Sequence, residues 1–253
     1  YDTFIHHFGS VSFKEDKSFF HNLLTKNAIK FKEKWGFDPI YSTFCRSEII
    51  DLINNVKKEN IKVLEVGAAC GNTLLKISNI NKTAKLYAIE LNKSSAEIAS
   101  TFAEVINIDV EKEEIPYEES FFDCIIFADV LEHLYNPEKV LKSFKKYLKK
   151  DGIIVASIPN VMHISVVKDL LRGFWTYSEA GILDNTHIRF FTFNEIKQMF
   201  GNAGYNKLVF AKTKTILSCE EQEIIEKISK LNIAKNIEEF STYQWLVRAE
   251  KIE

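Results

Sequence analysis

The segment VLEVGAACGNTLL, residues 63–75, constrains the fold of this chain more than any other stretch. Val63–Val66 has the apolar composition of a strand that is buried on both faces of a sheet. Gly67 and Gly71 allow a tight turn, because glycine adopts backbone angles that other residues avoid. Asn72 then begins a run of apolar residues with helical spacing. A strand, a glycine turn and a helix in this order open a βαβ unit, whose turn lies at the carboxyl end of a parallel strand.

Strands and helices alternate as far as residue 159. The pattern predicts strands at 62–66, 85–89, 104–108, 122–128, 152–158, 205–214 and 242–249, and helices at 72–80, 94–103, 137–149, 193–203 and 220–231. Such alternation favours a sheet covered by helices on both faces. We therefore expect an α/β fold: a Rossmann-like, doubly wound sheet of seven strands. The alternation implies parallel strands, and the residues before the first strand add N-terminal helices.

The pattern also predicts how the chain is divided. Residues 1–41 are expected to form a helical extension, with a helix over 17–35. Residues 42–253 are expected to form the main domain, which begins with a helix at about 42–58. Residues 160–193 interrupt the alternation of strands and helices. We expect them to form a lid over the ligand site at the carboxyl ends of the parallel strands.

Composition narrows the class of protein. The chain has 253 residues, 46% of them hydrophobic, and a net charge of −2, which allows a sizeable core and argues against a nucleic-acid partner. No apolar run approaches the ~20 residues that cross a bilayer. The four cysteines have no C-x-x-C spacing, so we expect reduced thiols, no bound metal and a cytoplasmic location.

The glycine turn departs from the dinucleotide fingerprint G-x-G-x-x-G. Ala69 stands where a second glycine would let the backbone approach a pyrophosphate, and Asn72 stands at the third glycine position. Glu65 would repel a pyrophosphate and attract a ligand that carries positive charge. A nicotinamide-dependent oxidoreductase is therefore the weaker hypothesis. An alanine at position 69 costs little if its φ angle stays negative.

Three further strand ends carry polar residues, and parallel strands bring their carboxyl ends to one edge of the sheet. Glu90 closes the strand in YAIEL, where a carboxylate can accept both hydroxyls of a ribose. Asp109 in NIDVE follows the third strand, where an acceptor can meet an adenine amino group. The segment FADVLEHL, residues 127–134, follows the fourth strand.

Together these segments resemble the class I S-adenosylmethionine-dependent methyltransferases. The resemblance rests on VLEVGAACG, YAIEL, NIDVE, FFDCIIFADVLEHL and LKKDGIIVASIPN, in this order over residues 42–250. It implies a mostly parallel sheet with one antiparallel strand near the C-terminus. It also implies S-adenosylmethionine as the cofactor and methyl transfer as the activity. The residues it implies for cofactor binding are Glu65, Gly67, Ala68, Gly71 and Asn72 at the methionine end, Glu90, Leu91, Asp109 and Val110 at the ribose and adenine, and Asp129, Val130 and Leu131 near the sulfonium.

Methyl transfer to a hydroxyl requires removal of the hydroxyl proton, best by a group that titrates near neutral pH. Histidine is such a group. His133 follows the fourth strand, His163 follows the fifth strand, and His187 lies within the expected lid. We expect His133 or His187 to act as the base and Arg189 to orient the acceptor. The alternative is catalysis by alignment alone, without a base.

The expected lid suggests an acceptor. Its aromatic residues are Phe174, Trp175, Tyr177, Phe190, Phe191 and Phe193, which suit a sugar ring or form the core of the lid. The strings SIPNVMH and GILDNTHIRFFT resemble a bacterial methyltransferase subgroup of cell-surface polysaccharide and glycosyltransferase loci, which implies a glycan hydroxyl as acceptor. The alternatives are a small-molecule O- or N-methyltransferase and a non-catalytic cofactor-binding module beside a glycosyltransferase.

The first residues carry a separate resemblance. The string HHFGSVSFKEDKSFF and the later FKEKWG resemble the tail of family-2-type bacterial glycosyltransferases. Because the chain begins with Tyr1 rather than Met, a fused upstream glycosyltransferase is one hypothesis. The other is a helical cap over the cofactor site.

Overall fold

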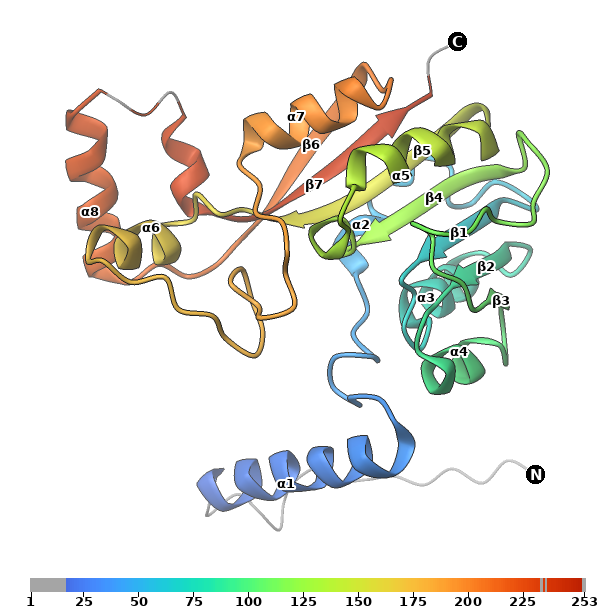
Figure 1. Cartoon of the computed structure of the whole chain (residues 1–253), viewed down its shortest axis with the longest axis horizontal. Coiled ribbons are helices and arrows are strands. Elements are labelled where there is room, and N and C mark those ends of the chain that lie inside the picture. The colour runs from blue at the N-terminus through green and yellow to red at the C-terminus, as the bar shows by residue number, and fades with distance from the viewer. Residues whose placement is uncertain (1–16, 233, 235, 252–253) are drawn as a thin grey trace. The chain divides into compact units, whose positions relative to one another are not determined.

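The computed structural model describes residues 17–232, 234 and 236–251, and the chain divides into two units, Tyr1–Phe44 and Cys45–Glu253 (Figure 1). Most of the string that resembles a glycosyltransferase tail, residues 6–16, lies outside the described part. The first unit contains α1 (Lys17–Trp35), the helix that the spacing predicts. Gly36 follows it with a φ of +78°, a left-handed angle that ends the helix.

The second unit is built on one sheet of seven strands with the order β3-β2-β1-β4-β5-β7-β6. The strands are β1 (Lys62–Val66), β2 (Lys85–Ile89), β3 (Glu104–Ile106), β4 (Phe122–Ala128), β5 (Leu148–Pro159), β6 (Lys207–Lys214) and β7 (Thr242–Glu250). The first five are parallel, and β7 runs antiparallel to both of its neighbours. The predicted seven-stranded, mostly parallel fold is confirmed.

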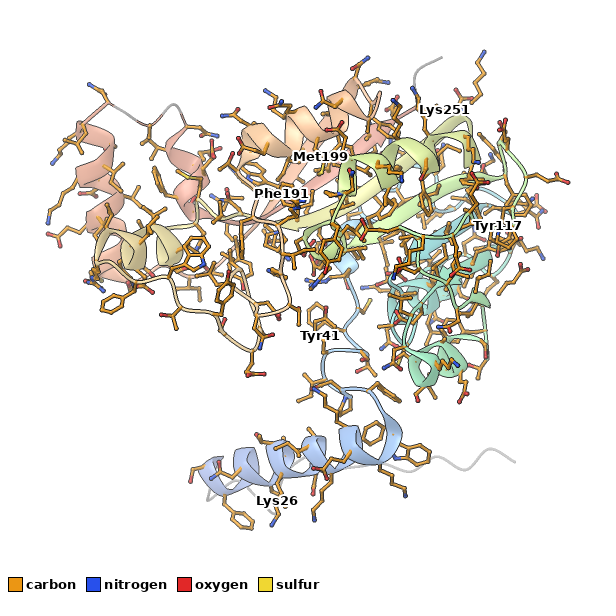
Figure 2. The ribbon with its side chains drawn as sticks, in the orientation of Figure 1. Lys26, Tyr41, Tyr117, Phe191, Met199 and Lys251 are labelled. Atoms are coloured by element: carbon orange, nitrogen blue, oxygen red, sulfur yellow. The ribbon has the colours of Figure 1, made fainter. Side chains whose placement is uncertain are left out.

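Helices cover both faces of this sheet (Figure 1). The helices of the second unit are α2 (Ser47–Ile50), α3 (Asn72–Ile80), α4 (Lys93–Ala99), α5 (Pro137–Phe144), α6 (Ile164–Leu171), α7 (Phe193–Asn202) and α8 (Cys219–Lys230), with 3₁₀ turns η2 (Leu131–His133), η3 (Lys145–Tyr147) and η4 (Ile237–Ser241). Of these, α6 and α8 lie beyond the end of the sheet (Figure 1). One core packs α5 and α7 on the sheet through Phe144 and Met199 (Figure 2). The other packs α2 and α3 through Ile49 and Leu74.

The helix expected over residues 42–58 is much shorter in the structure. Only α2 is α-helical, and the N–H groups of Leu52, Ile53 and Val56 bond to carbonyls three residues earlier, as in 3₁₀ turns. Asn54 and Asn55 favour such turns, because their side chains compete for backbone hydrogen bonds. Ile53 is still buried, so the turns fill the core as a helix would.

The segment between β5 and α7 contains α6 and then a loop. Asn160, fully buried, anchors its start: the side-chain amide donates to the carbonyls of Glu239 and Thr242 at 2.7 Å each. Its end is anchored by a bridge from Asn160 to Phe191. Within the described part of the chain, no helix has the length and apolar character to cross a membrane.

Candidate active site

The glycine-rich turn between β1 and α3 connects three strand ends. Gly67 and Gly71 adopt left-handed φ angles of +68° and +78°. The N–H groups of Gly67 and Ala68 donate to the carbonyl of Ile89 at 2.8 and 3.2 Å, which fixes the turn to the end of β2. A Cβ atom on Gly67 would lie 2.7 Å from Cγ2 of Val130, just after β4. A larger residue at position 67 therefore has to displace Val130.

Ala69 departs from the expectation of a negative φ. Its φ is +48°, and a left-handed residue other than glycine costs roughly 1–2 kcal/mol. The carboxylate of Glu90 supports this strained turn: Oε2 accepts a hydrogen bond from the Ala69 N–H at 2.7 Å, and Oε1 accepts one from Asn92 at 2.8 Å. The carboxylate that the sequence assigns to a ribose thus also holds the turn in place.

Glu65 is a buried carboxylate at the end of β1. Glu65 is 3% exposed, and its Oε2 has no hydrogen-bond partner among the described residues. Burial raises the pKa of Glu65 to about 8, against hydrogen bonds from Thr73 and Leu74 that lower it. An unpaired buried carboxylate is costly, and a positively charged ligand would remove that cost. The site therefore suits a cation at this position.

Asp129, directly after β4, is held by three partners. Its Oδ1 accepts hydrogen bonds from Ser157 Oγ at 2.6 Å and from Gln244 Nε2 at 2.9 Å, and its Oδ2 pairs with the guanidinium of Arg46. Arg46 carries no signal in the sequence, since a single arginine before a four-residue helix forms no motif. The positive charge of Arg46 also lowers the pKa of Glu65, so Arg46 is part of the same charged site.

The residues assigned to the adenine lie at the ends of β2 and β3. Leu91 is 65% exposed, which leaves its side chain free to cover a ligand. Asp109 pairs with Lys112 at 2.7 Å and accepts a hydrogen bond from Glu111, and the Lys112 contact lowers the pKa of Asp109. Asp109 thus stabilises its own turn, and its backbone and Val110 remain the candidates for ligand contact.

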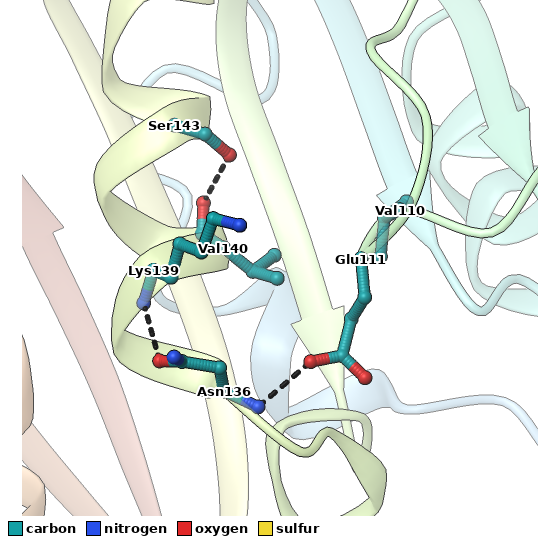
Figure 3. Close-up of a pocket in the computed structure, with 6 residues that line it drawn as sticks. All are labelled: Val110, Glu111, Asn136, Lys139, Val140 and Ser143. Carbon is teal, nitrogen blue, oxygen red and sulfur yellow. Dashed lines mark hydrogen bonds between the residues drawn. The ribbon is translucent and has the colours of Figure 1, made fainter.

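Two cavities of this unit bear on the position of the site. One of about 120 Å³ is lined by Val110, Glu111, Asn136, Lys139, Val140 and Ser143 (Figure 3). Within it, Glu111 accepts the N–H of Asn136 at 2.7 Å, which fixes the start of α5. The other, of about 540 Å³, lies at the amino end of the sheet beside Lys58 and Lys149. Neither lining includes the glycine-rich turn or a histidine, so we assign the site from the strand ends, where open α/β sheets bind ligands.

Two histidines that are far apart in the sequence meet beside the end of β4. His133 lies in η2, and His187 lies in the loop before α7. The N–H groups of Ile188 and Arg189 both donate to the carbonyl of Glu132 at 3.0 Å, which fixes that loop against η2. The rings of His133 and His187 pack edge to face, with centroids 4.8 Å apart. The structure therefore brings together the two histidines that we expect to be catalytic.

Backbone carbonyls orient both rings. Nδ1 of His133 lies 3.2 Å from the carbonyl oxygen of Thr186, and Nδ1 of His187 lies 3.0 Å from that of Ile182. A carbonyl only accepts, so each Nδ1 carries a hydrogen and each neutral ring keeps a lone pair on Nε2. Burial lowers the pKa of His133, and the nearby His187 lowers it further. His133 is therefore neutral near pH 7 and able to accept a proton or a cation.

Glu132 completes this cluster and is not among the residues predicted from the sequence. It is 1% exposed, and neither carboxylate oxygen has a hydrogen-bond partner within the described ranges. Burial raises the pKa of Glu132 to about 8, which Arg46 counteracts and Asp184 reinforces. Its Oε1 lies 3.9 Å from Nε2 of His187. The sequence did carry a signal for Glu132, because it directly precedes His133 after the end of the fourth strand.

The other polar candidates make contacts of their own. Arg189 is exposed, and its guanidinium donates to the carbonyl of Tyr135 at 2.6 Å. His163 caps α6: Nδ1 contacts the Ser165 hydroxyl at 2.8 Å, and Nε2 contacts the Thr215 hydroxyl at 3.0 Å. Because both ring nitrogens of His163 are engaged, this histidine has a structural role.

The aromatic residues of the segment 160–193 fall into two groups. Trp175 and Tyr177 pack around Phe190, with ring centroids at 5.2 and 6.2 Å, and remain 38% and 51% exposed. Phe190 in turn lies 6.4 Å from the ring of His187. Phe193 instead packs in the core against Trp245. Only the first group forms a surface beside the histidines.

The geometry is that of a Rossmann-like methyltransferase, and the comparison with protein families identifies the chain. A family model described as a methyltransferase domain matches residues 40–209, and the chain belongs to this family. S-adenosylmethionine is therefore its cofactor. The residues fit this cofactor, because Glu65 offers an unpaired buried carboxylate to a cationic ligand.

Individual relatives agree with this assignment. A ubiquinone biosynthesis O-methyltransferase from Pelagibacter ubique is 30% identical over 139 residues, 52% of this chain and 57% of that protein. A SAM-dependent methyltransferase from Archaeoglobus fulgidus shares the fold, with a TM-score of 0.58, 18% identity and coverage of 88% and 99%. The [4+2]-cyclase SpnF also shares it, with a TM-score of 0.55, 14% identity and coverage of 81% and 80%. The fold alone thus does not fix the reaction.

Proposed function

We propose that this chain transfers the methyl group of S-adenosylmethionine to a hydroxyl oxygen of a sugar-containing acceptor. The observation that carries the proposal is the cluster of Glu132, His133 and His187, whose ring lone pairs adjoin the strand end that also supplies Asp129 and Val130. A hydroxyl acceptor has to lose its proton during transfer, and neutral histidines are suited to take it.

The cofactor roles follow from the strand ends. Glu65 faces the methionine ammonium or the sulfonium, Glu90 accepts the ribose hydroxyls, and Asp109 and Val110 contact the adenine. Two observations support these roles. The carboxyl ends of β1, β2 and β3 lie at the same edge of the sheet, and Oε2 of Glu65 is unpaired among the described residues. We add Arg46 to this set. Its guanidinium pairs with Asp129 and would bind the carboxylate of the methionine by exchanging Asp129 for it.

The bound cofactor supplies an already activated methyl group, so the chain mainly aligns the acceptor and excludes water. The acceptor oxygen forms its bond to the methyl carbon, and the electron pair of the broken carbon–sulfur bond returns to sulfur. The hydroxyl proton passes to the histidine cluster. Two observations support such alignment: Val130 contacts Gly67, and Glu132 is bonded through its carbonyl to Ile188 and Arg189.

The exposed aromatic group favours a ring-shaped acceptor. Trp175 and Tyr177 present apolar faces near His187, and a sugar ring stacks on such faces through its C–H groups. The ends of the segment 160–193 are anchored by Asn160 and Glu132, so we limit the proposed lid to about residues 172–186. The product of a glycosyltransferase, fused or encoded nearby, is a suitable acceptor.

A second candidate is a phenolic hydroxyl. The relative from Pelagibacter ubique is named for O-methylation in ubiquinone biosynthesis, and an aromatic acceptor would stack on Trp175 as well as a sugar would. Both candidates use the same site and differ only in the acceptor.

Labelled methyl transfer tests the proposal. The chain would be incubated with methyl-labelled S-adenosylmethionine and separate panels of oligosaccharides, nucleotide sugars and catechols, and products would be identified by mass spectrometry. We expect O-methylated sugar. O-methylated catechol would favour the second candidate, and N-methylated product or no transfer to any panel would contradict the proposal.

A further inference from the structure

The cluster beside η2 has the composition of a metal site. One ligand atom from each of Glu132, His133 and His187 lies within 4.8 Å of the other two. Ligands that share an ion with bonds of about 2.1 Å lie roughly 3.0–3.4 Å apart. Small side-chain rotations therefore suffice to bring these three atoms around one ion, and their backbone is already fixed by the hydrogen bonds of Ile188 and Arg189 to Glu132.

The histidines are oriented as metal ligands are. In metalloproteins the ring nitrogen that does not bind metal usually donates to a carbonyl or a carboxylate, which fixes the tautomer. Nδ1 of His133 and of His187 contact the carbonyls of Thr186 and Ile182. The remaining Nε2 atoms are the ones with lone pairs, and that of His187 faces Glu132 Oε1 at 3.9 Å.

The carboxylate lacks the compensation that such burial requires. Glu132 is 1% exposed, and both oxygens are without hydrogen-bond partners in the part of the chain described here. Arg46 lies near enough to affect Glu132, but it is paired with Asp129. Asp184 adds a second negative charge nearby, with Oδ1 accepting from the N–H and the hydroxyl of Thr186. A divalent cation would balance this charge.

We infer that Glu132, His133 and His187 bind a divalent transition-metal ion, which departs from the expectation of no metal drawn from the cysteine spacing. Two imidazoles and one carboxylate favour zinc, iron, cobalt or manganese over magnesium or calcium, which prefer oxygen ligands. Three protein ligands leave coordination positions open. This inference rests on the proposed function and changes one step of it. With both Nε2 atoms on the ion, the histidines no longer accept the hydroxyl proton, and the cation instead promotes loss of that proton to solvent.

Cobalt binding tests the inference with a readout other than activity. Chelator-treated full chain would be titrated with Co²⁺, with visible absorption and calorimetry as the two measurements, and Zn²⁺ would then be added as competitor. We expect one Co²⁺ per chain, displaced by Zn²⁺. We expect Glu132→Gln, His133→Ala and His187→Ala each to weaken binding about tenfold or more. Glu132→Gln keeps the shape of the side chain and adds no buried charge, so it should remain folded.

His163→Ala is the matched control, because it removes a buried histidine outside the cluster and should keep full Co²⁺ binding. Absence of stoichiometric binding, or equal binding by the wild type and Glu132→Gln, would overturn the inference. Methyl transfer to a hydroxyl without Co²⁺ binding leaves the proposed function in place and removes the metal. Co²⁺ binding without methyl transfer to any acceptor panel leaves the metal site in place and contradicts the proposed function.

Discussion

The glycine-rich turn after β1 and the histidine cluster after β4 lie at the same end of the sheet but are assembled differently. The turn is contiguous in sequence, and its shape is imposed by glycines at positions 67 and 71 and by Glu90. The cluster combines η2 with a loop more than fifty residues later, joined by two hydrogen bonds to the carbonyl of Glu132. The first depends on local backbone conformation, and the second depends on tertiary contacts. Substitutions should therefore separate cofactor binding from transfer.

The largest expected effect is on turnover. His133→Ala and His187→Ala should each lower kcat by about 10²–10⁴-fold, because each removes a group that accepts the hydroxyl proton or holds the ion that promotes its loss. Calorimetry with S-adenosylhomocysteine should show nearly unchanged affinity. If both variants keep full turnover on the acceptor found in the screen, catalysis is by alignment alone and the histidine assignment is wrong.

The turn is tested by a pair of glycine substitutions. Gly67→Ala should weaken S-adenosylhomocysteine binding by roughly 10–100-fold, because the residue has left-handed φ and its Cβ would contact Val130 at 2.7 Å. Gly173→Ala is the control, with φ +86° but no described atom within 4 Å of the added Cβ. Equal losses of cofactor affinity in the two variants would show that backbone strain, and not the close approach of Val130, matters.

The two regions share one electrostatic property, which denaturation can measure. The pKa of Glu65 and of Glu132 is raised from 4.5 to about 8 in the folded chain. Between these values the folded state keeps a proton that the unfolded state has lost. Stability therefore falls as pH rises from about 4.5 to 8, by up to about 1.4 kcal/mol per pH unit for each carboxyl.

Urea denaturation of the metal-free chain between pH 5 and pH 8 tests this. The free energy of unfolding should depend less steeply on pH in Glu65→Gln and in Glu132→Gln than in the wild type. Glu97→Gln, an exposed position on α4, is the control and should keep the wild-type slope. A wild-type stability that is constant over this range would contradict the buried, protonated state of both carboxyls.

The smallest expected effect concerns the aromatic surface. Trp175→Ala should raise the acceptor KM several-fold, since one stacking contact is worth about 0.5–1.5 kcal/mol. Cofactor affinity and kcat should change little. Ile216→Ala, at another exposed position, should leave KM unchanged. An unchanged KM in Trp175→Ala would place the acceptor elsewhere.

The sequence predicted the parts that depend on local pattern. The strands β1, β2 and β4 have the bounds that the apolar runs predict, because strands buried on both faces are continuous apolar runs. The prediction of a helix over residues 42–58 was wrong. Asn54 and Asn55 favour turns, and the spacing of apolar residues does not reveal them. The left-handed φ of Ala69 also escaped prediction, because it depends on Glu90 at the end of another strand.

The charged parts of the site could not be predicted, because they depend on tertiary contacts. The pairing of Arg46 with Asp129 joins residues from separate motifs. The burial of Glu132 depends on the return of the loop that carries His187. Its position before His133 was visible in the sequence, but its unpaired carboxylate was not.

Calorimetric titration of the wild type and Glu90→Ala with S-adenosylhomocysteine tests the central claim most directly, because Glu90 is placed both to support the turn and to bind the ribose. We expect wild-type affinity in the micromolar range, roughly −8 kcal/mol. Glu90→Ala should lose about 1–3 kcal/mol, because the ribose hydroxyls and the Ala69 N–H lose a charged acceptor. No binding by the wild type, or equal affinity in the variant, would contradict the assignment of this strand-end site to the cofactor.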